Sequence, residues 1–208
     1  MNKTRLEAFS DGVFAIIITI LVLEIKVPEL GAMATNEELW YILSDYGHIL
    51  IGYFLSVAVV AMFWLSHHFL FHVSAKNIDR WVVQINTLFL AILALIPFSA
   101  GLIGTYPNLE VAGVIYGINL LAAALCNGLL FSYIQKSSTI ENGDVSSRVK
   151  KQGSIRRWIT YIGFGLGIIA SIQGMYYISI VLYCIPIVFN NIPGALDFTE
   201  EFLGLNFD

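Results

Sequence analysis

The sequence predicts an all-α integral membrane protein with six transmembrane helices, and three observations lead to this fold class. Hydrophobic residues make up 57% of the chain and charged residues only 12%, which is outside the range of soluble domains. Long apolar runs recur along the chain, and the lysines and arginines gather in alternate loops between them. A soluble enzyme or a nucleic-acid-binding module is therefore not expected.

Six segments are apolar over enough residues to cross the hydrocarbon core, which is about 30 Å thick and needs roughly 20 helical residues. They cover residues 9–27, 48–71, 81–105, 110–134, 157–174 and 176–191. Small or kink-permitting residues inside them indicate close helix approach and local bending, namely Gly163, Gly165, Gly167, Pro97 and Pro186. The whole chain, 1–208, is then one six-helix transmembrane domain with a polar linker at 134–156 and a tail at 192–208.

The positive-inside rule sets the expected orientation. Basic residues precede the first span and fill the loops after the second and fourth spans, namely Lys3, Arg5, Lys76, Arg80, Lys136, Arg148, Lys150, Lys151, Arg156 and Arg157. The other loops are mainly acidic, with Lys26 as their single basic residue. Both termini, the 134–156 linker and the 192–208 tail are therefore expected in the cytoplasm of a multi-pass protein of the cell membrane.

An acidic residue at the mouth of the first span indicates a functional position. Phe9, Ser10 and Asp11 run directly into the apolar segment, and a carboxylate at the centre of a spanning helix costs roughly 2.5 to 3.5 kcal/mol on insertion scales. We expect polar partners at the same depth to offset this cost.

The sequence contains no motif for a cofactor or an enzymatic reaction. A phosphate-binding glycine loop and paired cysteines at zinc spacing are both absent. His68 and His72 share a helix face, but two histidines without a nearby carboxylate make a weak metal site. We therefore expect no cofactor and no resident metal, and we expect His67 and His68 to be polar partners for Asp11.

One face of the first span forms a continuous stripe. At about 100° per residue, Ile16, Thr19 and Leu23 fall within about 40° of Gly12, and Lys26 continues the stripe. Ser10 and Asp11 lie off it, at about −200° and −100°. The stripe would either line a pore or form ordinary bundle core, and periodicity alone does not choose between the two.

The segment R-x-x-x-F-S-D-G-x-F-A-I-x-x-T at residues 5–19 resembles the signature of the Transmembrane Protein 175 family of potassium channels, specifically its single-repeat bacterial members. The resemblance continues in Phe63-Trp64-Leu65-Ser66-His67-His68 and in Leu95-Ile96-Pro97-Phe98. It covers the first three spans with specific residues and the last three by hydropathy alone.

This resemblance implies a homotetramer whose first helices surround a central pore. It places the hydrophobic constriction at Ile16, with Thr19 or Ile20 and Leu23 as further layers toward the outside. Because Ser10 and Asp11 point away from the stripe, we expect them to hold the first helix to its neighbours through polar partners at the same depth. The expected network comprises Arg5, Phe9, Ser10, Asp11, His67, His68, Trp81 and Asn86. Potassium would be the main permeant ion, with sodium and protons passing more weakly.

The alternative is a secondary transporter, for example a proton-coupled antiporter with Asp11 or Glu24 as the proton carrier. Intramembrane carboxylates carry protons in pumps. However, transporters commonly show repeated halves or broken helices around a midplane site, and neither is visible in the sequence. A third reading, a scaffold without transport activity, leaves Asp11 without a role.

Overall fold

The computed structural model describes residues 2–31, 35–141 and 147–191, and this part of the chain is mostly helical. Its α-helices are α1 (Lys3–Leu21), α2 (Asn36–Asp45), α3 (Gly47–Phe69), α4 (Arg80–Leu93), α5 (Ile96–Thr105), α6 (Glu110–Lys136), α7 (Ser147–Ile172) and α8 (Tyr176–Asn191). A 3₁₀ segment, η1 (Val22–Glu24), extends α1, and a π-helical segment, η2 (Leu70–Ser74), extends α3. The expected tail at 192–208 lies outside the described residues.

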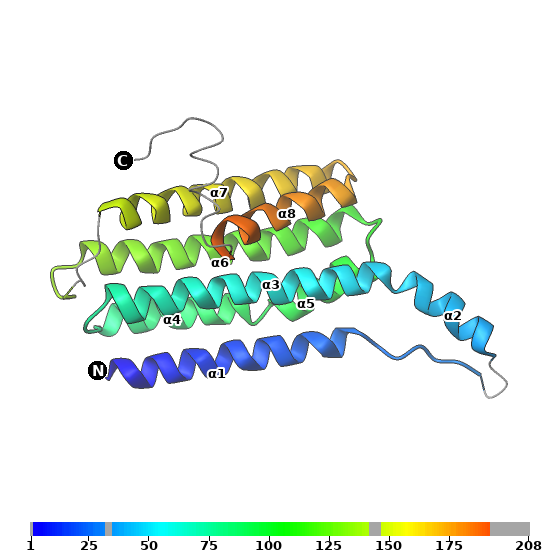
Figure 1. Ribbon diagram of the computed structural model, residues 1–208, viewed down its shortest axis with the longest axis horizontal. Coiled ribbons are helices and arrows are strands. Elements are labelled where there is room, and N and C mark those ends of the chain that lie inside the picture. Colours follow the sequence, from blue (N-terminus) through cyan, green and yellow to red (C-terminus); the bar gives the residue numbers. More distant parts are fainter. Residues whose placement is uncertain (1, 32–34, 142–146, 192–208) are drawn as a thin grey trace.

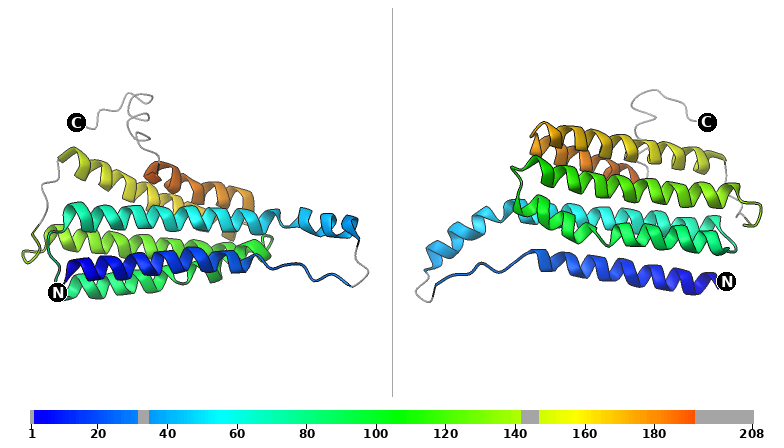
Figure 2. Two further views of the ribbon diagram at one scale, coloured as in Figure 1. Left: turned by 60° about the horizontal axis from the view of Figure 1, so that its bottom comes forward. Right: turned by 180° about the vertical axis from the view of Figure 1, so that it is seen from behind.

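The long helices lie side by side along one axis, with α1 at one edge of the bundle and α7 and α8 at the other (Figures 1 and 2). The start of α1, the α3–α4 turn, the end of α6 and the start of α7 are all at one end, which we call the N-terminal end. The α5–α6 and α7–α8 turns are at the opposite end, where α2 projects at an angle. Consecutive long helices therefore run in alternating directions, as the alternating basic loops require.

Four helical stretches of the described chain are long and apolar enough to cross a membrane: Lys3–Glu24, Gly47–His72, Arg80–Thr105 and Glu110–Lys136. They match the first four expected spans. Helix α8 is a shorter apolar helix, and α7 begins with a charged turn that contains Arg148, Lys150 and Lys151. The all-α membrane fold is thus confirmed, whereas a count of six spans stays a prediction.

The third apolar segment is interrupted near its middle, as Pro97 suggested. Helix α4 ends at Leu93 and α5 starts at Ile96, with Pro97 in its first turn. Proline has no amide hydrogen and its ring crowds the preceding turn, so one unbroken helix is disfavoured at this point. Pro186, in contrast, lies inside α8 without ending it.

Helix α2 was not anticipated by the search for long apolar runs, because it is short and only half apolar. A capping box starts it: the Glu38 amide donates to Thr35 Oγ1 at 3.2 Å, and the Thr35 amide donates to Glu38 Oε2 at 3.0 Å. Tyr46, at its end, donates its hydroxyl to the carbonyl oxygen of Lys26 at 2.7 Å. This bond ties the segment after α1 to the start of α3.

At the N-terminal end of the bundle, Asp79 joins the α3–α4 turn to the chain after α6. One carboxylate oxygen caps α4 through the Val82 amide at 2.9 Å, and the other accepts from Tyr133 at 2.6 Å and Thr139 at 2.9 Å. Partial burial alone would raise the pKa of Asp79, but these hydrogen bonds hold it below its usual value. The connection after α6 is therefore fixed as far as Glu141, whose amide donates to Asn77 Oδ1 at 2.7 Å. Because α6 extends to Lys136 and α7 starts at Ser147, the interhelical connection is shorter than the expected 134–156 linker.

The packing of α6, α7 and α8 centres on the fully buried Tyr183. Its hydroxyl donates to the Gly113 carbonyl oxygen at 3.0 Å and lies 3.2 Å from Ser171 Oγ. Gly117 and Gly167 leave room for the ring, since a Cβ at either position would overlap Tyr183. Close approach at Gly163 and Gly167 agrees with the sequence analysis, whereas Gly165 faces open space.

We expect Gly167→Ala to lower the free energy of unfolding by about 1–3 kcal/mol, because the added methyl group overpacks against a buried ring that has no room to move. The matched control is Gly165→Ala on the same helix, which should be neutral or stabilising by up to about 1 kcal/mol, since alanine favours the helix. Thermal unfolding of the purified protein in detergent measures both. Equal unfolding temperatures for the two variants would contradict this account of the packing.

Candidate functional site

Helix α1 has one fully packed face and one face without a partner in the chain. Its buried positions recur with the helical period: Leu6, Ser10, Phe14, Ile17 and Leu21. They contact α3, α4 and α5, so α1 lies on one side of the bundle and nothing in the described chain covers its far side.

The uncovered face of α1 is aliphatic. Ile16 is 57% exposed, Ile20 40% and Leu23 69%, and Thr19 is exposed between them. The Thr19 hydroxyl donates to the Ile16 carbonyl oxygen at 2.9 Å, so its hydrogen is already used within the helix. The structure therefore places all four expected pore residues on one exposed surface, which offers aliphatic groups and a hydroxyl oxygen but no charge.

Lys26 does not belong to this surface, contrary to the expected continuation of the stripe. The helix ends at Glu24, and Ile25 leaves the helical region with φ −86° and ψ 88°. The 100° rule no longer applies beyond that point. Lys26 is exposed in the segment that leads toward α2, and its carbonyl oxygen is held by Tyr46.

Three buried polar side chains from three helices form one hydrogen-bonded chain, which we call the Ser10–Asn86–His67 chain. Asn86 Nδ2 donates to Ser10 Oγ at 3.0 Å, and His67 Nε2 donates to Asn86 Oδ1 at 2.9 Å. Ser10 Oγ donates in turn to the Leu6 carbonyl oxygen at 2.9 Å. None of the three side chains is more than 2% exposed. The chain therefore links α1, α4 and α3 inside an apolar core.

Aromatic rings surround the His67 end of the Ser10–Asn86–His67 chain. The His67 ring lies 4.5 Å from Phe71, 5.6 Å from Phe14 and 6.2 Å from Phe89, measured between ring centroids. Phe14 comes from α1 itself and is only 2% exposed. Water is excluded from the polar groups, so each must be satisfied by its protein partner.

Asp11 has a different partner from those expected. Its Oδ1 accepts a hydrogen bond from Trp64 Nε1 at 2.9 Å, and none of His67, His68, Trp81 and Asn86 is bonded to it. Asp11 lies on the exposed flank of α1, whereas His67 and Asn86 are buried beneath the face that carries Ser10, about 100° away around the helix. The tryptophan belongs to the Phe63–His68 segment that carries the family resemblance, so an indole donor at the right depth was the signal that the sequence analysis missed.

The remaining members of the expected network do not join it. Phe9 is 56% exposed and Trp81 63% exposed, and the Arg5 side chain is exposed in the first turns of α1. His68 stacks on Trp64 at 5.8 Å, so it supports the Asp11 partner indirectly. The network thus divides into a buried part, Ser10–Asn86–His67, and an exposed part, Asp11–Trp64 with His68.

His68 and His72 stack at 5.2 Å between ring centroids, as their spacing on one helix face indicated. Within the described ranges, no group of three or more histidine, cysteine, aspartate or glutamate side chains is placed to hold a metal ion. The arrangement offers no nucleophile beside a base. What it offers is a rigidly fixed helix that presents an aliphatic face away from its own subunit.

Replacing Asn86 tests whether the buried chain stabilises the docking of α1. Asn86→Leu keeps the volume but strands the His67 N–H and removes a donor to Ser10, so we expect a loss of about 1–3 kcal/mol in the free energy of unfolding. Thr87→Val changes an exposed neighbour on the same helix and should stay within about 0.5 kcal/mol of the unmodified protein. Chemical or thermal unfolding in detergent gives both values. Equal stability of the two variants would show that the Ser10–Asn86–His67 chain does not stabilise the docking of α1.

The chain resembles known proteins over most of its length. It is 34% identical over 192 residues to a protein from Chryseobacterium sp. named as a potassium channel, covering 89% of this chain and 94% of that relative. A crystal structure described as a lysosomal potassium-selective channel TMEM175 homolog from Chamaesiphon minutus matches with a TM-score of 0.70 and 27% identity, over 91% of this chain and 98% of that chain. The endosomal/lysosomal proton channel TMEM175 of Danio rerio is 37% identical over 105 residues, which is 48% of this chain and 20% of that protein.

The family model described as endosomal/lysosomal potassium channel TMEM175 matches residues 5–97, the part that holds α1, the Ser10–Asn86–His67 chain and the Asp11–Trp64 pair. Together with the apolar helices, these matches identify a multi-pass membrane protein. The match to the Chryseobacterium relative covers 89% of this chain and so extends beyond the residues that the family model matches. This chain belongs to the TMEM175 family.

Proposed function

We propose that this protein is a potassium-permeable cation channel in which four subunits surround a central pore lined by their α1 helices. Conduction is passive, and the narrowest point is a ring of four Ile16 side chains, with Thr19, Ile20 and Leu23 forming the layers beyond it. The relatives named as potassium channels support the choice of ion. No cofactor, resident metal or nucleic acid takes part in this function.

The observation that carries this proposal is the division of α1 into two faces. A helix at the edge of a bundle that buries Phe14, Ile17 and Leu21 completely and leaves Ile16 and Leu23 more than half exposed has room for a second contact surface. Four copies of the same face around an axis satisfy that requirement by closed symmetry. The exposed surface then becomes the wall of a conduit rather than a lipid contact.

An aliphatic ring selects weakly and in favour of potassium. It provides no oxygen ligands to replace water, so an ion sheds part of its hydration shell at a cost, and potassium holds that shell less tightly than sodium. In a narrower state the same ring excludes water and closes the pore. The Thr19 hydroxyl hydrogen is bound to the Ile16 carbonyl oxygen, so this layer presents an oxygen acceptor to a passing cation.

The membrane placement follows from the same proposal. Six helices, α1, α3, α4 with α5, α6, α7 and α8, cross the bilayer of a bacterial cell membrane as one domain, and both termini are cytoplasmic. Basic residues crowd the N-terminal end of the bundle, which supports this orientation. Sodium and protons permeate more weakly, and the name of the Danio rerio relative, a proton channel, supports the permeation of protons.

The proton-coupled transporter is the competing function, and bilayer recordings separate it from a channel. The purified protein in a planar bilayer should show unitary current steps, whereas saturable coupled flux without steps would indicate a transporter. Asp11 is exposed on the flank of α1 and bonded to Trp64, and Glu24 is half-buried beside Gly101, so neither carboxylate is fully enclosed by the subunit.

Ile16→Asn tests the constriction directly. A polar ring stays wet and offers amide oxygens, so we expect a several-fold higher conductance and a shift of the reversal potential in mixed potassium and sodium toward equal permeability. Single-channel recordings in a planar bilayer measure both quantities. The control is Leu23→Ala, which widens a second ring without making it polar and should change selectivity less. Ile17→Asn does not serve as a control, because Ile17 is buried in the subunit. An unchanged reversal potential in Ile16→Asn would place the filter elsewhere.

A further inference from the structure

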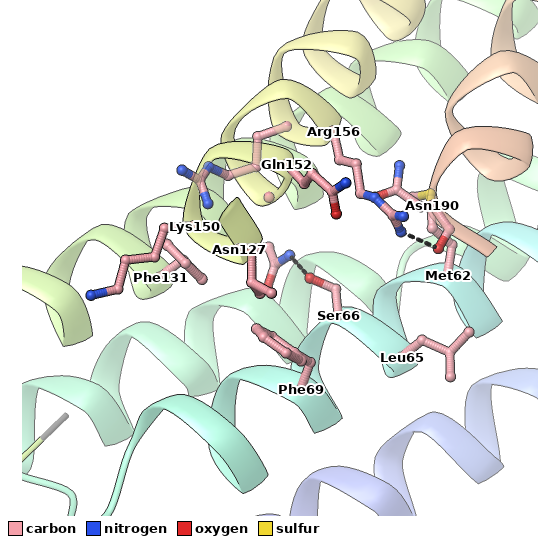
Figure 3. Close-up of a pocket in the computed structure, with 13 residues that line it drawn as sticks. Met62, Leu65, Ser66, Phe69, Asn127, Phe131, Lys150, Gln152, Arg156 and Asn190 are labelled. Atoms are coloured by element: carbon pink, nitrogen blue, oxygen red, sulfur yellow. Dashed lines mark hydrogen bonds between the residues drawn. The ribbon is translucent and has the colours of Figure 1, made fainter. Parts of the chain in front are cut away.

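A cavity of about 310 Å³ lies between α3, α6, α7 and α8 (Figure 3). Helices α7 and α8 are on the side of the bundle away from α1 (Figure 1). Its lining includes residues from the N-terminal half of α7 and Asn190, which is close to the last described residue of α8. Helix α7 has 26 residues and α8 has 16 as far as the structure describes it, which correspond to about 39 Å and about 24 Å of helix.

Basic side chains surround this cavity. Lys150, Arg156 and Arg157 come from the first three turns of α7, and no described residue of the lining carries a carboxylate. In the part of the chain that the structure describes, none of these three side chains forms an ion pair. Three positive charges around one hollow without an anion make a site that favours an anionic ligand.

The two arginines are held in place by groups other than acids. Arg156 Nη1 donates to the Asn190 carbonyl oxygen at 3.1 Å, and the Arg157 guanidinium lies 4.2 Å from the centroid of the Phe131 ring. A guanidinium has five N–H donors, so these contacts leave donors for a further acceptor. Arginine forks match phosphate oxygens in pairs.

The rest of the lining is partly polar and partly apolar. Asn127 Nδ2 donates to Ser66 Oγ at 2.8 Å on one wall (Figure 3). On α3, Leu65 and Phe69 line the cavity and are 44% and 36% exposed, so the apolar wall continues onto the outer surface of a candidate membrane span. A ligand with an anionic head and an apolar body fits this combination.

We propose that this cavity binds the phosphate headgroup of an anionic phospholipid. A volume of about 310 Å³ is at the lower limit of small-molecule pockets, roughly 300–1,000 Å³, so it holds a glycerophosphate head while the acyl chains stay outside against α3. The cavity lies toward the basic N-terminal end of the bundle, where anionic lipid attracts lysine and arginine. The inference rests on the proposed placement in the membrane and not on ion conduction.

Two other anionic groups are alternative occupants. One is a phosphate from solution, and the other is the acidic tail of this chain, in which Asp197, Glu200 and Glu201 follow α8 in the sequence. A phospholipid is favoured because the cavity opens beside the exposed Leu65 and Phe69, a surface that lipid covers in the membrane. The bilayer also supplies the ligand at a high local concentration. The experiment below separates the three occupants.

The test is native mass spectrometry of the full-length protein in detergent, titrated with phosphatidylglycerol, phosphatidylcholine or glycerol 3-phosphate. Lys150→Gln with Arg156→Gln should weaken phosphatidylglycerol binding about tenfold or more. The matched control, Lys76→Gln with Lys136→Gln, removes two exposed charges at the same end of the bundle but outside the cavity, and should leave the affinity unchanged.

A second variant blocks the cavity without removing a charge. Gly153 lines the cavity, and a Cβ there would meet only Arg157, at 4.0 Å, so Gly153→Leu places its side chain in open space and favours the helix. It should also weaken phosphatidylglycerol binding about tenfold, whereas Gly165→Leu on the same helix should not. Helical circular dichroism shows that each variant is folded.

Four results would overturn the proposal. These are unchanged phosphatidylglycerol binding in Gly153→Leu, equally tight binding of phosphatidylcholine, and displacement of the lipid by an equal concentration of glycerol 3-phosphate, which would identify a soluble phosphate as the ligand. The fourth is an increase of about tenfold in lipid affinity when Asp197, Glu200 and Glu201 are replaced by their amides, which would identify the acidic tail as the occupant.

Discussion

The rotational position of α1 depends on the buried Ser10–Asn86–His67 chain. In an apolar core a polar group without a partner costs more than a hydrogen bond contributes, so Ser10 and Asn86 must face one another. Rotation of α1 by one residue, about 100°, would bury Asp11 in place of Ser10 and strand two polar side chains. The exposed positions of Ile16, Ile20 and Leu23 follow from this constraint, because they lie on the other side of the same helix.

The division of labour within the Phe9-Ser10-Asp11 motif follows from the same geometry. Consecutive helical residues point in directions about 100° apart, so the three side chains reach three different environments. Ser10 is enclosed by the subunit, Asp11 accepts from Trp64 at its flank, and Phe9 is 56% exposed. A carboxylate that stays at the flank keeps its charge solvated and still fixes α1 to α3 through the indole.

Much of this organisation follows from the sequence. The lengths of the apolar runs predict the long helices. Pro97 predicts local bending in the third segment because proline cannot donate the helical hydrogen bond, and the structure has the break between α4 and α5 beside it. The helical period separates Ser10 from Ile16, and the structure has the first buried and the second 57% exposed. These features depend on the covalent chain and on its local period, which are visible without coordinates.

Other features depend on how helices meet, which periodicity does not encode. Trp64 rather than a histidine bonds to Asp11, because the depth and direction of donors on α3 are set by its packing against α1. The stripe does not reach Lys26, because the backbone leaves the helix after Glu24, and the helical period alone does not register the Pro28 that disfavours helix just beyond it. The cavity beside α7 is lined by residues of four helices, so the sequence alone showed its lysine and arginines only as basic residues between two apolar segments.

The central claim is that the exposed face of α1 lines the ion path, and thiol accessibility tests it most directly. Ile16→Cys and Ile17→Cys place a thiol on the exposed and the buried face of the same turn, where the native residues are 57% and 2% exposed. Silver ions enter narrow pores and bind thiolates, so they should block the current of Ile16→Cys at a rate several-fold above that of Ile17→Cys and of the unmodified protein, which carries Cys126 and Cys184. Equal block rates in the two variants, or block of Ile17→Cys alone, would contradict the assignment of this face to the pore.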